Sequence, residues 1–330
     1  AALQLGAKIA CGQIDSAIAA GSDTTSDAPI VFGRKFAKRL IKLANAKSMG
    51  ERLAALKGFN PKELAPVAPG SGEPRTKMAM GEYCELMAKE WGISRIDQDR
   101  LAYNSHKKAA AAYDQGFFDD LIVPCAGVSR DNHLRADTTQ AKLATLKPAF
   151  DRKSGKGTLT AGNSTPLTDG ASSVLLASED WAKARGLPIQ AYLTYGKTAA
   201  VDFVAGEGLL MAPTVAVARL LQDTGLSLQD FDYYEIHEAF AAQVLCALRA
   251  WESDKYCRER LGLAKALGSI DRAKLNVKGS SLAFGHPFAA TGGRIVATLA
   301  KLLEQKGSGL GLISVCTAGG MGVVAVLERP

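Results

Sequence analysis

The chain has 330 residues, of which 47% are hydrophobic and 22% charged. This composition is that of an ordinary globular enzyme and excludes a disordered or fibrous chain. No apolar stretch approaches the ~18 uninterrupted residues of a membrane span. The length exceeds what one hydrophobic core usually holds, so we expect two domains or one large duplicated domain.

The net charge of +7 is concentrated in one region, because residues 31–156 carry 23 Lys+Arg against 14 Asp+Glu. This excess indicates either a solvated surface or a docking face for an anionic partner such as a nucleotide, a membrane surface or nucleic acid. The six cysteines show no paired spacing. We therefore expect neither a zinc site nor a disulfide framework, and a reducing, cytosol-like compartment.

The first elements follow from local pattern. Residues 1–12, AALQLGAKIACG, form an apolar helical pattern that Gly12 can end. Because this helix is already running at residue 1, we expect the chain to be numbered from inside a larger protein. Residues 16–20 are typical of a short buried strand. The basic region 31–156 is interrupted by proline and glycine and mostly helical, as at 80–90 and 96–115, and is predicted to be an inserted subdomain.

Strands and helices alternate in the remainder of the chain. The pattern predicts strands at 170–178, 189–195, 233–236, 311–316 and 323–328, and helices at 179–185, 214–222, 239–251 and 290–305. This alternation indicates an α/β layer structure with mainly parallel pairing.

One internal repeat is visible. Residues 1–12 followed by SAIAAGSD resemble residues 290–307 followed by GLGLISVC. If this is a duplication, each copy should present a loop just before its helix. In the second copy that loop is Gly285-His286-Pro287, and in the first it precedes Ala1.

Three segments contain residues suited to catalysis. In SLAFGHPFAAT, the turn before a helix places His286 at the helix N-terminus, where the dipole favours a neutral imidazole that can act as a base. In SVCTAGGMG, Cys316 ends a buried strand and precedes glycines that let backbone N–H groups approach a ligand. In EIHEAFA, His237 lies between a strand and a helix.

Each segment also has a structural reading when taken alone. A turn histidine can be purely structural, a strand-end cysteine is usually an inert core residue, and Glu238 can simply complement a helix dipole. EIHEAFA is not a metalloprotease HExxH motif, since the fourth residue after His237 is Ala241. Together, however, the three segments lie at junctions where α/β active sites assemble. Cysteine with histidine suits nucleophilic or proton-transfer catalysis on a thioester.

The segments GHPFAATGGR, HEAFAAQ and CTAGGMG resemble the three C-terminal signature blocks of the thiolase family. HEAF stands where many thiolases have NEAF, and in this it is similar to the thiolase subunits of fatty-acid β-oxidation complexes. The resemblance continues in TAGNSTPLTDGASSVLLAS, in KMAMGEYCELMAKEWGISRIDQDRLAYNSH and in GSDTTSDAP. It therefore covers essentially the whole chain.

The resemblance implies a thiolase-like fold of duplicated βαβαβ layers with an inserted, mainly helical loop subdomain. Residues 1–30 and 157–186 would be the remainder of an incomplete N-terminal half, 31–156 the insertion, and 187–330 the C-terminal half. It also implies thiolytic cleavage of 3-ketoacyl-CoA by CoA in fatty acid β-oxidation. The alternatives are a biosynthetic acetoacetyl-CoA thiolase and a non-catalytic acyl-CoA binding or carrier protein of thiolase descent. Ketosynthases of the same fold typically lack a second cysteine, so Cys316 argues against them.

By the same resemblance, the nucleophilic cysteine would lie upstream of Ala1, and none of the six cysteines matches it, so this chain alone should be inactive. His286 would assist that cysteine, and Cys316 would protonate the acetyl-CoA enolate or abstract its proton. His286 and His237 would stabilise the enolate oxygen, with His237 replacing the Asn of NEAF, which holds a water in the family. His237 could either hold that water or donate directly. These groups should face a common cavity. The backbone N–H of Ala318, where most relatives have glycine, would serve a second oxyanion hole if its φ is negative.

Met80 and Phe240 match positions that line the acyl and pantetheine pocket, although either could be simple core. The basic region would contact the phosphates of CoA. CoA and acyl-CoA are substrates, and neither a cofactor nor a metal is expected. We expect a homo-oligomer, possibly with a hydratase/dehydrogenase subunit, in the cytoplasm or in a mitochondrial matrix, with no nucleic-acid partner. His106 and His133 are predicted to be surface residues, and Cys84, Cys125, Cys246 and Cys257 to be packing residues.

Overall fold

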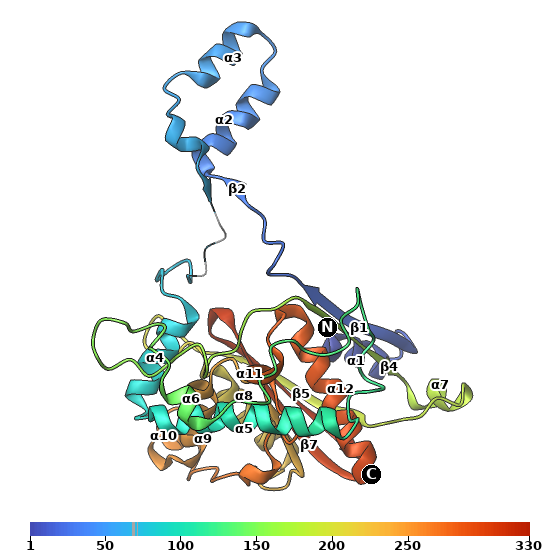
Figure 1. The fold of residues 1–330 in the computed structure, drawn as a ribbon. Coiled ribbons are helices and arrows are strands. Elements are labelled where there is room, and N and C mark those ends of the chain that lie inside the picture. Colours follow the sequence, from blue (N-terminus) through green and yellow to red (C-terminus); the bar gives the residue numbers. More distant parts are fainter. Residues whose placement is uncertain (68–69, 71) are drawn as a thin grey trace. The chain divides into compact units, whose positions relative to one another are not determined.

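The computed structural model describes residues 1–67, 70 and 72–330 (Figure 1). These residues form two compact units, one made of Ala1–Asp23 with Gly72–Pro330 and the other of Thr24–Ser71. The two units are described separately below.

The larger unit contains the helices and strands of an α/β fold. Its helices are α1 (Ala2–Ala10), α4 (Met80–Glu90), α5 (Arg95–Asp114), α6 (Gln140–Ala144), α7 (Glu179–Ala184), α8 (Ala212–Thr224), α9 (Ala241–Glu252), α10 (Asp254–Glu259), α11 (Ser281–Phe284) and α12 (Phe288–Lys306). Its strands are β1 (Ser16–Asp23), β4 (Gly170–Ala177), β5 (Tyr192–Ala200), β6 (Tyr233–Ile236), β7 (Gly309–Thr317) and β8 (Met321–Arg329), with short 3₁₀ turns η2 (Arg272–Lys274) and η3 (Ala318–Gly320).

The four-stranded sheet is mixed, and the two-stranded sheet formed by β1 and β4 is antiparallel. One has the strand order β5-β8-β7-β6, and the other pairs β1 with β4. Within these described sheets β6–β7 is parallel, whereas β5–β8, β7–β8 and β1–β4 are antiparallel. The expectation of mainly parallel pairing is therefore wrong. Strands β7 and β8 are joined only by the three residues of η3, and a parallel crossover needs a dozen or more.

The repeat seen in the sequence has a structural counterpart. Helix α1 leads into β1, which pairs antiparallel with β4, and helix α12 leads into β7, which pairs antiparallel with β8. Helix α12 contacts strands of both sheets. Glycines permit this close packing, because a Cβ at Gly21 would lie 2.1 Å from the carbonyl oxygen of Ala289 in the first turn of α12.

The core of the larger unit lies where α8 and α9 pack on the β5-β8-β7-β6 sheet, with Trp251 and Leu312 fully buried. Residues 72–156 belong to this unit, where α4 packs against α9 and buries Met87 and Cys84 together with Cys246. The division into an N-terminal half, an insertion at 31–156 and a C-terminal half stays a prediction.

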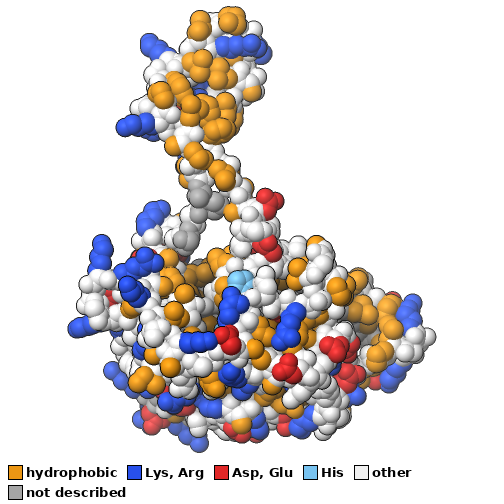
Figure 2. Space-filling view, in the orientation of Figure 1, with side chains coloured by type: hydrophobic (Ala, Val, Ile, Leu, Met, Phe, Trp, Pro, Cys, Tyr) orange, Lys and Arg blue, Asp and Glu red, His pale blue; other side chains and the backbone are white. Residues whose placement is uncertain are grey.

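The smaller unit consists of β2 (Val31–Phe32), α2 (Arg34–Asn45), α3 (Met49–Leu56), η1 (Pro61–Leu64) and β3 (Pro66–Val67). Arg39 holds it together, because its guanidinium donates to the carbonyl groups of Ala55, Lys57 and Gly58 and to Glu63. None of its described residues is buried. Figure 2 shows many apolar side chains on its surface. The exposed large hydrophobic residues of this unit include Phe32, Ile41, Met49 and Leu53.

None of the described helices of either unit is both long and apolar enough to cross a membrane.

Candidate active site

Two histidine side chains from distant parts of the chain are in contact. His237 follows β6 and His286 precedes α12, and their ring centroids are 4.3 Å apart. The N–H of His237 donates to the carbonyl of Ser314 at 2.8 Å, which extends the β6–β7 pairing by one residue. The N–H of His286 donates to the carbonyl of Pro166 at 3.0 Å. Backbone bonds on both sides thus fix where the two imidazoles meet.

In each imidazole, Nδ1 forms a hydrogen bond with a side-chain hydroxyl group. Nδ1 of His237 lies 2.8 Å from Oγ of Ser281, and Nδ1 of His286 lies 2.6 Å from Oγ1 of Thr291. Burial lowers the pKa of His286 to about 4, with a further contribution from the charge of Arg294. Burial also holds the pKa of His237 well below its usual value, helped by His286 and Arg294. Both rings are therefore neutral at pH 7.

Cys316 lies near the end of β7 in an apolar cluster and is only 6% exposed. The cluster includes Phe240, Leu159 and Met211, with Met80 packed against it. Burial raises the pKa of the Cys316 thiol to about 12, so the thiol is protonated at neutral pH. Met80 and Phe240 thus lie in the same cluster as this thiol, and their role in acyl binding stays a prediction. A cavity shared by Cys316 and His286 also stays a prediction.

One segment, residues 163–167, links two of the three signature segments, those that contain His237 and His286. Ser164 forms an isolated β-bridge with Phe240, and Leu167 forms one with His286. The N–H of Thr165 donates to the carbonyl of Ala239 at 3.0 Å. The carbonyl of Asn163 accepts from the N–H of Ala241, the first residue of α9, at 2.9 Å.

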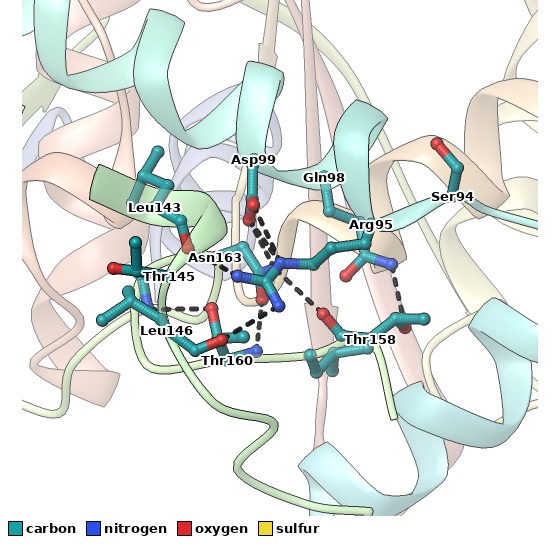
Figure 3. A network of polar contacts seen from close by, with 12 residues as sticks. Ser94, Arg95, Gln98, Asp99, Leu143, Thr145, Leu146, Thr158, Thr160 and Asn163 are labelled. Carbon is teal, nitrogen blue, oxygen red and sulfur yellow. Dashed lines mark hydrogen bonds and ion pairs between the residues drawn. The ribbon is translucent and has the colours of Figure 1, made fainter. Parts of the chain in front are cut away.

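A polar network holds this segment against α5 (Figure 3). The Asp99 carboxylate accepts from Nε of Arg95 at 2.8 and 2.9 Å and from Nδ2 of Asn163 at 2.9 Å. Arg95 also donates to the carbonyls of Leu143 and Leu146. Oδ1 of Asn163 accepts from the N–H of Thr160 at 2.7 Å. The network therefore fixes the backbone that positions Phe240 and His286.

The carboxylate of Glu238 connects the turn after β6 to three other elements. It accepts from the Ser105 hydroxyl at 2.7 Å, from Nδ2 of Asn276 at 2.8 Å and from the N–H of Leu282 at 3.3 Å. Burial raises the pKa of Glu238. In the structure Glu238 anchors the turn that carries His237. The three hydrogen bonds come from residues outside α9, the helix whose dipole Glu238 could complement.

Sequence reasoning missed Ser281 and Arg294. Nη2 of Arg294 donates to Oγ of Ser281 at 2.9 Å, and Ser281 in turn contacts His237. Both residues lie within or beside the segment that contains His286, but no local pattern indicates that they reach His237.

The remaining predicted residues are placed as follows. Ala318 has negative φ, because the described non-glycine residues with positive φ are Lys77, Ala126 and Asn276. Its N–H therefore meets the condition set for an oxyanion donor, a role that stays a prediction. His106 is buried and its Nδ1 accepts from the N–H of Arg135, so the surface prediction is wrong for it. Cys125 is exposed rather than packed, whereas Cys84, Cys246 and Cys257 are buried.

This arrangement suits a particular chemistry. A protonated buried thiol can give a proton to carbon, and neutral imidazoles can accept a proton or donate a hydrogen bond to a developing oxyanion. The fold and the site define an enzyme of the acyl-transfer class.

Comparison with known proteins identifies the family. Residues 1–180 match the model of the thiolase N-terminal domain, and residues 187–329 match that of the thiolase C-terminal domain. The chain belongs to the thiolase family and is an acyltransferase.

Individual relatives agree with this assignment. The chain is 42% identical over 326 residues to a 3-ketoacyl-CoA thiolase of Yersinia pestis, covering 97% of this chain and 74% of the relative. A solved structure of the Bacillus anthracis acetyl-CoA acetyltransferase matches with a TM-score of 0.77 and 30% identity, over 100% of this chain and 76% of that one. Human mitochondrial 3-ketoacyl-CoA thiolase matches with a TM-score of 0.77 and 27% identity, over 98% of this chain and 73% of that one.

Proposed function

We propose that this acyltransferase cleaves 3-ketoacyl-CoA with free CoA, giving acetyl-CoA and a shortened acyl-CoA in fatty acid β-oxidation. The reverse reaction is a Claisen condensation. The observation that carries the proposal is the 4.3 Å contact between two neutral imidazoles, His237 and His286, in a chain 42% identical to a 3-ketoacyl-CoA thiolase.

The first half-reaction needs a nucleophile, a base, an oxyanion donor and an acid. The nucleophilic thiol implied by the family attacks the 3-keto carbon, and His286 takes its proton. The bond between C2 and C3 breaks and leaves the enolate of acetyl-CoA, whose oxygen accepts a hydrogen bond from His237. The Cys316 thiol gives its proton to C2. A pKa of about 12 keeps that thiol in the protonated form the step requires.

The second half-reaction restores every group. The Cys316 thiolate takes the proton of the incoming CoA thiol, and the CoA sulfur attacks the acyl group bound to the enzyme. The backbone N–H of Ala318 stabilises the tetrahedral oxyanion. When this intermediate collapses, the nucleophile leaves as a thiolate and regains its proton from His286.

We propose CoA and acyl-CoA as the ligands and the basic residues between positions 31 and 156 as the source of contacts to the CoA phosphates. A solved structure of human mitochondrial 3-ketoacyl-CoA thiolase in complex with CoA, matching with a TM-score of 0.77, supports CoA as a ligand. We further propose a homo-oligomer that can associate with a hydratase/dehydrogenase subunit. The proposed compartment is the cytoplasm, or the mitochondrial matrix in a eukaryote.

The test is CoA-dependent cleavage by the full-length protein of 3-ketoacyl-CoAs of several chain lengths, including acetoacetyl-CoA. We expect turnover of the longer substrates and a loss of about 10²- to 10⁴-fold in His286→Ala. Turnover of acetoacetyl-CoA alone would favour a biosynthetic thiolase. Binding of acyl-CoA with no turnover above the His286→Ala background would leave only a carrier role.

A further inference from the structure

A chain of three side chains lies behind the contact between the two imidazoles. Arg294 on α12 donates from Nη2 to Oγ of Ser281 on α11, at 2.9 Å. Oγ of Ser281 lies 2.8 Å from Nδ1 of His237. Ser281 and His237 are fully buried. We call this set the Arg294–Ser281–His237 relay.

The direction of each hydrogen bond follows from the chemistry of the groups. A guanidinium has donors only, so Ser281 Oγ must accept from Arg294. The Ser281 hydroxyl then has one proton left to donate. Among the described residues, Nδ1 of His237 is the acceptor within hydrogen-bond distance of Ser281 Oγ. The hydroxyl therefore donates to Nδ1, and a neutral imidazole that accepts at Nδ1 carries its proton on Nε2.

The other ring nitrogen of His237 is available for a ligand. Nε2 of His237 is buried and has no hydrogen-bond partner among the described residues. A buried donor left unpaired is costly and in native proteins usually has a functional reason. A substrate oxygen that accepts from Nε2–H would satisfy it.

Other groups also act on Arg294. Its guanidinium carbon lies 5.4 Å from the centre of the Phe284 ring. The carboxyl groups of Glu235 and Glu238 interact electrostatically with it. Its positive charge disfavours protonation of His237. One residue thus both directs the Ser281 hydroxyl and helps to keep the imidazole neutral.

We propose that Ser281 and Arg294 are positioning residues that hold His237 in the Nε2–H tautomer, so that it donates directly to the oxygen of the thioester enolate. The role in the reaction rests on the proposed function, whereas the tautomer does not.

The tautomer is measured by ¹⁵N NMR of the histidine rings in the 330-residue chain. With four histidines in the sequence the spectrum is sparse, and the His237 signals are those missing from a His237→Gln sample. We expect Nε2 protonated and Nδ1 bare in the unmodified chain, and loss of this single tautomer in Ser281→Ala. Ser280→Ala is the matched control, because Ser280 also contacts Arg294 but has no bond to His237. A proton on Nδ1 in the unmodified chain overturns the relay without any variant.

The positioning role is measured by thiolysis with the full-length protein. We expect Ser281→Ala to lower kcat by about 10- to 100-fold with KM unchanged, and Ser280→Ala to match the unmodified enzyme. If either the His237 spectrum or kcat is unaltered in Ser281→Ala, the proposal is wrong. If the unmodified enzyme has no thiolase activity, the proposed function fails, while the spectra still decide the relay.

Discussion

Replacing Asp99 by asparagine should destabilise the larger unit much more than the same change in an exposed ion pair. The Asp99 side chain is 6% exposed and pairs with Arg95, whose side chain is 23% exposed. Removing one partner of a buried pair typically costs about 3–5 kcal/mol. Arg95 keeps its two carbonyl acceptors, and the amide oxygen introduced by the substitution can still accept from Asn163. We therefore expect a loss of about 2–4 kcal/mol in the free energy of unfolding.

Asp137→Asn is the matched control. Asp137 pairs with Lys142 at 2.7 Å, but their side chains are 77% and 62% exposed, so we expect a change within about 0.5 kcal/mol. Urea unfolding followed by tryptophan fluorescence suits this comparison, because all three tryptophans belong to the larger unit. Amide hydrogen exchange should also accelerate across residues 158–167 in Asp99→Asn alone. Equal stability of the two variants would refute the role assigned to the network in Figure 3.

Three further predictions concern the site. The imidazole of His286 should titrate in NMR with a midpoint near pH 4. The free energy of unfolding should therefore fall as the pH drops from about 6.5 to 4, because the unfolded state binds more protons in this range. A midpoint near pH 6.5 would contradict this prediction. Gly285→Ala should lower the free energy of unfolding, measured with urea, by about 1–3 kcal/mol more than Gly307→Ala does. Both glycines have φ +90°, but a Cβ at Gly285 would lie 2.4 Å from Cγ2 of Thr168, whereas nothing lies within 4 Å at Gly307; equal costs would dismiss the steric argument. Intact mass spectrometry should find no acyl adduct on any of the six cysteines after incubation of this chain with 3-ketoacyl-CoA. Four thiols are buried with raised pKa values, and neither of the two exposed cysteines matches the nucleophilic cysteine of the family. An adduct on any of the six would show that a nucleophile is present.

Local pattern was enough to locate most elements of the larger unit. The helix at 80–90 and the strand at 233–236 have the predicted bounds, because the period of apolar residues depends on local geometry alone. The direction of strand pairing was not predictable in the same way. It depends on the connection between β7 and β8, where three residues form a turn that periodicity does not reveal.

The site was predictable in its parts and only partly in its arrangement. His237, His286 and Cys316 could be found because each lies at the end of an element, and the contact between the two imidazoles agrees with a common site. Ser281 could not be found, since it lies 44 residues from His237 in the sequence and meets it only through the packing of α11. The insertion at 31–156 stays a prediction, and the structure has a compact unit at residues 24–71. Composition shows where the chain becomes basic, but the packing of α4 on α9 decides which residues join the larger core.

Helix α12 limits how the sequence of this enzyme can diverge. Its first turn follows His286 directly, and the helix rests on β1 and β4 through glycines. A Cβ at Gly21 would press on the carbonyl of Ala289, and one at Gly293 would lie 2.3 Å from Oγ of Ser172. A larger residue at either position would displace the helix and with it the imidazole. Selection for reaction rate therefore acts also on β1 and β4, which pack against this helix, and laboratory evolution of acyl-chain preference should leave Gly21 and Gly293 unchanged.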